Sequence, residues 1–149
     1  MKKSMIMALA SAITLTAFPV SAQPSWPLTY SGFADVRKAP GPILNCPFDI
    51  VFNNTTDVTV VNTSVSGPCA TFTINSNPHA YTYNHTTGAL SVSGFDVTTT
   101  LTPGNCFGTL HAIKLNGVLT INNSALVGGL DANNNPTGDC TVEGVFERD

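Results

Sequence analysis

Short stretches of alternating apolar and polar residues run through most of the chain. In the stretch 45–53, apolar side chains occupy every second position from Cys46 to Phe52, and Asp49 and Asn53 take positions between or after them. Because successive side chains of a strand point to opposite faces, this alternation predicts a strand with one buried face. The same signal predicts strands at 45–53, 58–66, 69–75, 81–84, 89–101, 106–115, 118–127 and 140–146, with a further possible strand at 29–36.

Turn residues separate these strands. Asn116-Gly117 lies between two strand-like runs and predicts a tight β-hairpin. The apolar residues Leu90 and Val92 occupy even-numbered positions, whereas Phe95 occupies an odd-numbered one. Because this change would move the apolar side chains to the other face of the strand, we expect a β-bulge at Ser93-Gly94. The pattern as a whole predicts an all-β fold, either an antiparallel β-sandwich or a small β-barrel-like domain.

The first residues form a separate unit. Lys2 and Lys3 precede an apolar run that ends at Ser21-Ala22, which is typical of a signal peptide over residues 1–22; a retained membrane anchor is the alternative. We expect residues 23–42, which contain several prolines, to form an extended N-terminal arm. A single all-β domain should then cover residues 43–149.

The chain has four cysteines, and a signal peptide would deliver them to an oxidising compartment, so two disulfides are expected. Three pairings are possible, of which we favour Cys46 with Cys140 and Cys69 with Cys106. The sequence has no C-x-x-C motif, which argues against a zinc site or a redox-active pair.

The net charge of the chain limits the classes of molecule that it is expected to bind. Without Lys2 and Lys3 the chain keeps four basic and nine acidic residues, a net charge of −5. Nucleic acids and anionic lipid are therefore not expected partners, because both require clustered lysine and arginine. After signal cleavage no further segment is apolar enough to predict a transmembrane span.

No combination of residues predicts catalysis or a cofactor. Ser91 or Ser93, His111 and Asp96 could be imagined as a triad, but the chain lacks a G-x-S-x-G nucleophile elbow. The three histidines do not have metal-ligand spacing. We interpret His111 as a residue of a sheet face and the remaining two, His79 and His85, as exposed turn residues.

The loop from Asp131 to Asp139 is the one candidate metal site. Asp131, Asn133 and Asn135 alternate as they do at the start of a calcium loop. Pro136 and Val142, however, stand where such a loop needs glycine and a bidentate glutamate. An Asx-rich turn is therefore the preferred interpretation.

Several segments together resemble the PraB-like family, whose members are called activators of alkane oxidation. The likeness covers about residues 43–147. The residues that carry it are Leu44-Asn45-Cys46-Pro47-Phe48, Val65-Ser66-Gly67-Pro68-Cys69, Leu90-Ser91-Val92-Ser93-Gly94-Phe95-Asp96-Val97, Asn105-Cys106-Phe107-Gly108 and Asp139-Cys140-Thr141-Val142-Glu143-Gly144.

The resemblance implies secretion, association with the cell surface or biofilm matrix, and a link to the uptake or use of hydrophobic substrates; it implies no catalytic residues. We therefore expect a secreted, non-enzymatic protein that self-associates or contacts other surface proteins. The arm at 23–42 could donate a strand to a neighbouring subunit. The alternative function is a periplasmic or extracellular carrier that encloses a small apolar ligand.

Overall fold

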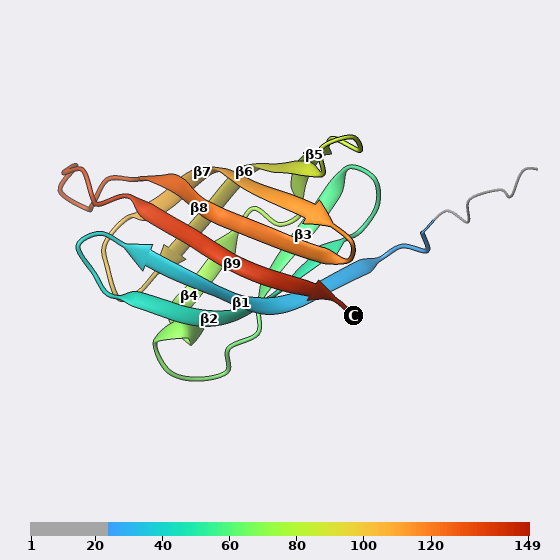
Figure 1. Cartoon of the computed structure of the whole chain (residues 1–149). Coiled ribbons are helices and arrows are strands. Elements are labelled where there is room, and N and C mark those ends of the chain that lie inside the picture. Colours follow the sequence, from blue (N-terminus) through green and yellow to red (C-terminus); the bar gives the residue numbers. More distant parts are fainter. Residues whose placement is uncertain (1–23) are drawn as a thin grey trace, which may run out of the picture.

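The computed structural model describes residues 24–149. In this part of the chain nine β-strands form a single sheet, and one short 3₁₀ helix lies between two of them (Figure 1). The predicted signal peptide lies outside the described residues. The elements are β1 (Leu28–Lys38), β2 (Ile43–Phe52), β3 (Asp57–Asn62), η1 (Pro68–Thr71), β4 (Phe72–Asn75), β5 (His79–Tyr83), β6 (Ala89–Thr99), β7 (Asn105–Leu115), β8 (Val118–Gly128) and β9 (Cys140–Arg148).

The sheet closes on itself. Its strand order is β4-β6-β5-β3-β2-β1-β9-β8-β7, and β6 also pairs with β7, so that eight of the described strands form a ring of antiparallel neighbours. β4 is an additional strand, which pairs with the second half of β6. The all-β, antiparallel prediction is confirmed, and of the two architectures expected, the small barrel is the one found.

The seam between β3 and β5 is the shortest ladder of the ring, with only Asp57 opposite Ala80 and Val58 opposite His79. Beyond it, the Asn62 side chain continues the connection from β3 toward β4. Its Nδ2 donates to the carbonyl oxygens of Cys69 (2.7 Å) and Phe72 (3.0 Å). Side-chain amides therefore replace backbone pairing where the ladder ends.

Alternate residues of the strands fill the barrel interior, which is the usual way in which an eight-stranded barrel is filled. The inward positions of β1 include Gly32, which lies opposite two large residues, Phe48 on β2 and Phe146 on β9. A Cβ added at Gly32 would approach the Phe146 Cα to 2.8 Å. A side chain at this position would collide with the β9 backbone, so glycine allows β9 to pack closely against β1.

Several local predictions are confirmed. The register of β6 against β7 shifts between Val92 and Phe95, where the parity change predicted a bulge. Asn116 and Gly117 both have positive φ and join the paired ends of β7 and β8, as expected for a tight hairpin. The predicted strand at 69–75 is only partly correct, because residues 68–71 form η1, with Pro68 near its start, and β4 begins at Phe72.

The segment assigned to an N-terminal arm contributes a full barrel strand. β1 pairs with β2 on one side and with β9 on the other. Both edges of Leu28–Lys38 are therefore occupied by the same chain.

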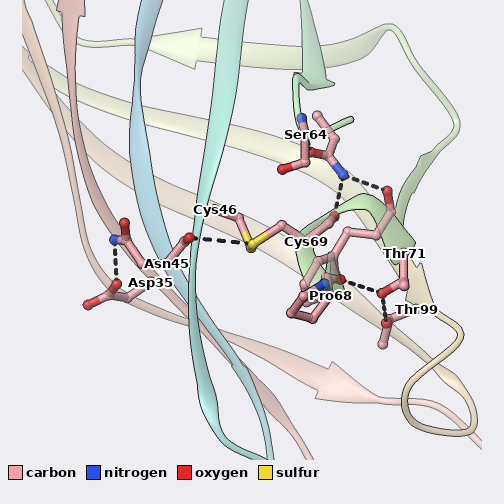
Figure 2. Close-up of a disulfide and its surroundings, with 10 residues drawn as sticks. Asp35, Asn45, Cys46, Ser64, Pro68, Cys69, Thr71 and Thr99 are labelled. Carbon is pink, nitrogen blue, oxygen red and sulfur yellow. Dashed lines mark hydrogen bonds between the residues drawn. A yellow bond between two sulfur atoms is a disulfide. The ribbon is translucent and has the colours of Figure 1, made fainter. Parts of the chain in front are cut away.

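All four cysteines form disulfides, but the favoured pairing is wrong. Cys46 on β2 is bonded to Cys69 in η1, with the Cα atoms 5.4 Å apart (Figure 2). Cys106 is bonded to Cys140 at a Cα separation of 6.0 Å. The reason is the barrel register, because both Cys106 and Cys140 lie beside the end of β8, opposite Gly128 and Leu126 respectively.

Candidate functional site

Three loops meet at one end of the barrel, on the left in Figure 1: residues 39–42, 100–104 and 129–139. Backbone hydrogen bonds join them. The Ala39 N–H donates to the Asp139 carbonyl (2.9 Å), and the Gly129 N–H donates to the Asn105 carbonyl (2.8 Å). We call this region the loop end, and these bonds hold its loops against one another.

Lys38 braces the loop end from inside. Its side chain is 6 % exposed, and its Nζ donates to the carbonyl oxygens of Gly104 (3.1 Å) and Asn105 (3.0 Å). Burial lowers the pKa of Lys38, because desolvation disfavours the ammonium form. The Cys106–Cys140 disulfide adds a covalent tie between the two strand starts beside these loops.

Large apolar side chains are exposed on this braced framework. Ile43, Leu101 and Leu130 are 62 %, 52 % and 57 % exposed, one at each of the three loops. Four prolines lie in or beside the same loops: Pro40, Pro42, Pro103 and Pro136. A surface hollow of about 260 Å³ lies between the loops and is lined in part by Pro40, Pro103 and Pro136. Such an arrangement can present a stiff apolar surface to another molecule.

The candidate calcium loop is held as an Asx turn. Asp131 Oδ1 accepts the N–H groups of Asn133 (2.8 Å) and Asn135 (2.9 Å), and Oδ2 accepts the Asn135 side-chain amide (3.3 Å). These bonds lower the pKa of Asp131. Amide groups of the loop itself thus donate to both carboxylate oxygens, as expected for an Asx-rich turn, the interpretation preferred from the sequence.

The barrel interior is filled. The void among the inward side chains measures about 30 Å³, which is comparable to the share of liquid volume of one water. A carrier would need a few hundred Å³ for a small apolar ligand. The described interior has no room for such a ligand, so the carrier alternative is not supported.

The end of the barrel opposite the loop end is closed by a second lysine. Lys114 Nζ lies 4.7 Å from the centre of the Phe52 ring, 5.2 Å from that of Tyr83 and 5.5 Å from that of Tyr30. Burial, and secondarily the charge of Arg148, lowers the pKa of Lys114. Lysine side chains therefore close both ends of the barrel, and contacts with other molecules are left to its outer surface.

The predicted exposure of His79 is wrong. His79 belongs to β5 and is 3 % exposed, and the centre of its ring lies 5.3 Å from that of the Phe95 ring. Its Nε2 atom has no hydrogen-bond partner among the described residues. Burial lowers the pKa of His79, although a hydrogen bond to the Gly94 backbone and the charge of Asp96 oppose the effect. His85 lies in an exposed turn, as expected.

The imagined triad is not assembled. Ser91 and His111 face each other across β6 and β7, with Ser91 Oγ 3.2 Å from His111 Nδ1. Asp96 lies beyond the bulge, opposite Phe107, and accepts the side-chain amide of Asn105. The Ser–His pair therefore lies on the exposed outer wall without an acid, and Ser93 Oγ donates to the Ala80 carbonyl instead. Within residues 24–149 no three potential metal ligands cluster.

Sequence reasoning missed the loop end. Ile43, Leu101 and Leu130 are far apart in the sequence, and each lies among polar or turn residues that indicate loops. The pairing of prolines with single large apolar residues at three strand connections is the signal that could have indicated it. The hydroxyl groups of Tyr81 and Tyr83 donate to the Asn54 and Lys114 carbonyl oxygens, respectively.

Comparisons with known proteins agree with the sequence resemblance. The family model for "Alkane oxidation protein activator PraA/PraB-like" proteins matches residues 1–149. No curated protein and no solved structure matches the chain. Two disulfides are typical of an oxidising environment, extracellular or periplasmic. Across residues 24–149 no helix has the length and apolar character needed to span a bilayer. The chain belongs to the alkane oxidation protein activator PraA/PraB-like family.

Proposed function

We propose that this protein is an exported, non-enzymatic component of the cell surface or biofilm matrix. In this proposal it contacts hydrophobic substrates such as alkanes through the loop end. The observation that carries the proposal is the contrast between a filled barrel and an apolar exterior: the interior void is about 30 Å³, whereas Ile43, Leu101 and Leu130 are each more than half exposed.

Rigid loops favour adsorption of the apolar side chains that they carry. Apolar side chains on a mobile loop would lose conformational entropy when they adsorb to a hydrophobic surface, and this loss opposes binding. At the loop end, Lys38, the Cys106–Cys140 disulfide and the bonds between loops hold the backbone that carries these apolar side chains in place beforehand. The membership in a family named for activating alkane oxidation supports an apolar target rather than a polar one.

A genetic experiment tests this proposal. A bacterium that lacks its own copy of the gene is supplied with the tagged wild type or with the Ile43→Ser/Leu101→Ser/Leu130→Ser variant and is grown on hexadecane. Wild type should restore growth and appear in the surface and medium fractions, whereas the variant should be exported equally but restore growth poorly. Equal growth with both proteins, or retention of the wild type in the cytoplasm, would contradict the proposal.

A further inference from the structure

A second surface, on the outer wall of the barrel beside the loop end, has an ordered arrangement of its own. On the outer wall of β2, β1 and β9, Phe33 lies directly between Pro47 and Val145. Phe33 and Val145 are 58 % and 53 % exposed. The three side chains form an apolar row across the strands, and a large aromatic at the centre of an exposed sheet face is typical of a contact surface.

Acidic residues flank this apolar row on both sides. Two residues along the strands in one direction, Ser31 lies between Asp49 and Glu147. Two residues in the other direction, Asp35 lies directly opposite Glu143. The wall is therefore striped, with an acidic row, an apolar row and a second acidic row. We call these residues the acidic wall: Asp35, Asp49, Glu143 and Glu147 around Phe33, Pro47 and Val145.

The acids of this wall differ from the acids elsewhere. The carboxylates of the five other aspartates each accept a hydrogen bond: Asp57, Asp96, Asp131, Asp139 and Asp149. Among the described residues, the side chains of Asp49, Glu143 and Glu147 accept none, and Asp35 accepts one, from Asn45. The wall carboxylates therefore have little structural role in the free protein.

One pair on the wall even opposes folding. Like charges directly opposite each other on antiparallel strands are destabilising, and Asp35 and Glu143 form such a pair. A pair of like charges that costs stability and has no cationic partner within the protein is typical of a functional surface. A cationic partner would remove the repulsion, so the charge pattern specifies the sign of what docks there.

We propose that the acidic wall docks a polypeptide segment of another protein, in which one apolar side chain lies between lysine or arginine side chains. Rows on a strand are two residues apart, about 6.6–6.8 Å. An extended segment parallel to β1 with the pattern Lys-x-Leu-x-Lys therefore places its cations over both acidic rows and its leucine over Phe33.

A second copy of this chain does not fit the wall. Of the four basic residues in the described part of the chain, Lys38 is buried and Lys114 lies under aromatic rings. Arg37 lies on the same wall, opposite Thr141, and Arg148 lies at the chain end. No described surface of this protein therefore offers an apolar residue between two cations. The inference does not rest on the proposed function, because none of the acidic-wall residues is one of the exposed apolar residues Ile43, Leu101 and Leu130.

A peptide titration followed by NMR tests the docking. The probe is Gly-Ser-Lys-Ser-Leu-Ser-Lys-Ser-Gly, and its control is Gly-Ser-Lys-Lys-Leu-Ser-Ser-Ser-Gly, which has the same composition but the wrong spacing. We expect amide shifts from the probe to concentrate on β2, β1 and β9, and the control to bind at least fivefold more weakly. Equal binding of the two peptides, or shifts elsewhere, would overturn the proposal.

Two matched variants separate this docking from general charge attraction. Asp35→Asn/Glu143→Gln removes two charges from the wall, and Asp57→Asn/Asp139→Asn removes two charges elsewhere. The wall variant should bind the probe at least fivefold more weakly and melt at a higher temperature than wild type, whereas the second variant should bind it nearly as wild type does. Equal losses in both variants would refute a specific wall. A wall variant that changes the oligomeric state without peptide would identify a self-interface instead.

Discussion

The Asn77 side chain hydrogen-bonds to both backbone groups of a single residue, Val60. Val60 N–H donates to Asn77 Oδ1 (3.1 Å), and Asn77 Nδ2 donates to the Val60 carbonyl (2.9 Å). The amide thus takes the place that a neighbouring strand would occupy beside β3. Because the β3–β5 ladder contains only two residue pairs, this side chain extends the closure of the barrel.

Replacement of Asn77 should weaken that seam. Asn77→Ala leaves the N–H and carbonyl of the buried residue Val60 without partners, so we expect a loss of about 1–3 kcal/mol in the free energy of unfolding, measured by urea titration. Asn133→Ala is the control, since only the backbone N–H of Asn133 is engaged in a hydrogen bond. An Asn77→Ala variant as stable as this control would show that the seam does not depend on the amide.

Stability should depend on pH through His79. Burial lowers the pKa of His79 in the folded state below the usual 6.5, so the unfolded chain binds the proton more readily. The contribution of neutral His79 is therefore present above pH 6.5 and is lost as pH falls below that value toward the folded-state pKa. His79→Gln should lose less stability between pH 7 and pH 5 than wild type in thermal melts.

The exposed His85 supplies the control for this prediction. His85→Gln should keep the pH dependence of the wild type, because His85 lies in an exposed turn. If His79→Gln and wild type melt with the same pH dependence, then the burial of the His79 ring does not control acid stability.

The disulfide pairing gives a direct chemical prediction. Digestion of the non-reduced protein with chymotrypsin separates all four cysteines, and mass spectrometry should find peptides that join Cys46 to Cys69 and Cys106 to Cys140. Each double serine variant should lose about 2–4 kcal/mol of stability. Peptides that join Cys46 to Cys140 would contradict the register described for the barrel.

The brace at Lys38 can be tested without changing the surface. Lys38→Met keeps the length and apolar stem of the side chain but removes the donors to the Gly104 and Asn105 carbonyls. Amide hydrogen exchange in residues 100–105 should become faster, while exchange in the hairpin at Asn116-Gly117 should remain unchanged. Unaltered exchange at both places would show that the ammonium does not hold the loop.

The sequence predicted the elements more completely than their arrangement. Alternation identified the strand faces, and a change of parity located the bulge after Val92, because both are local consequences of side-chain direction. A sandwich and a barrel share this alternation. What distinguishes the barrel is that β6 pairs with β7 as well as with β5 and β4, which closes the sheet. No local sequence pattern encodes that closure.

The incorrect assignments of individual residues have the same physical cause: contacts between segments that are far apart in the sequence. Cys140 meets Cys106 rather than Cys46 because both flank the end of β8, a relation that spacing along the chain does not reveal. His79 follows Pro78 and was therefore assigned to a turn, yet the strand begins at His79 and its ring is buried on Phe95. The loop end was not predicted because its three loops, which are far apart in the sequence, are joined only in the folded barrel.

Adsorption of the purified, disulfide-bonded protein to hexadecane droplets in water tests the central claim most directly. The loop-end variant Ile43→Ser/Leu101→Ser/Leu130→Ser is compared with Val61→Ser/Val65→Ser/Leu115→Ser, which removes three exposed apolar side chains outside the three loops. The account predicts that the first variant adsorbs at least fivefold less than wild type and that the second adsorbs nearly as wild type does. Equal adsorption of all three proteins, or equal losses in the two variants, would contradict it.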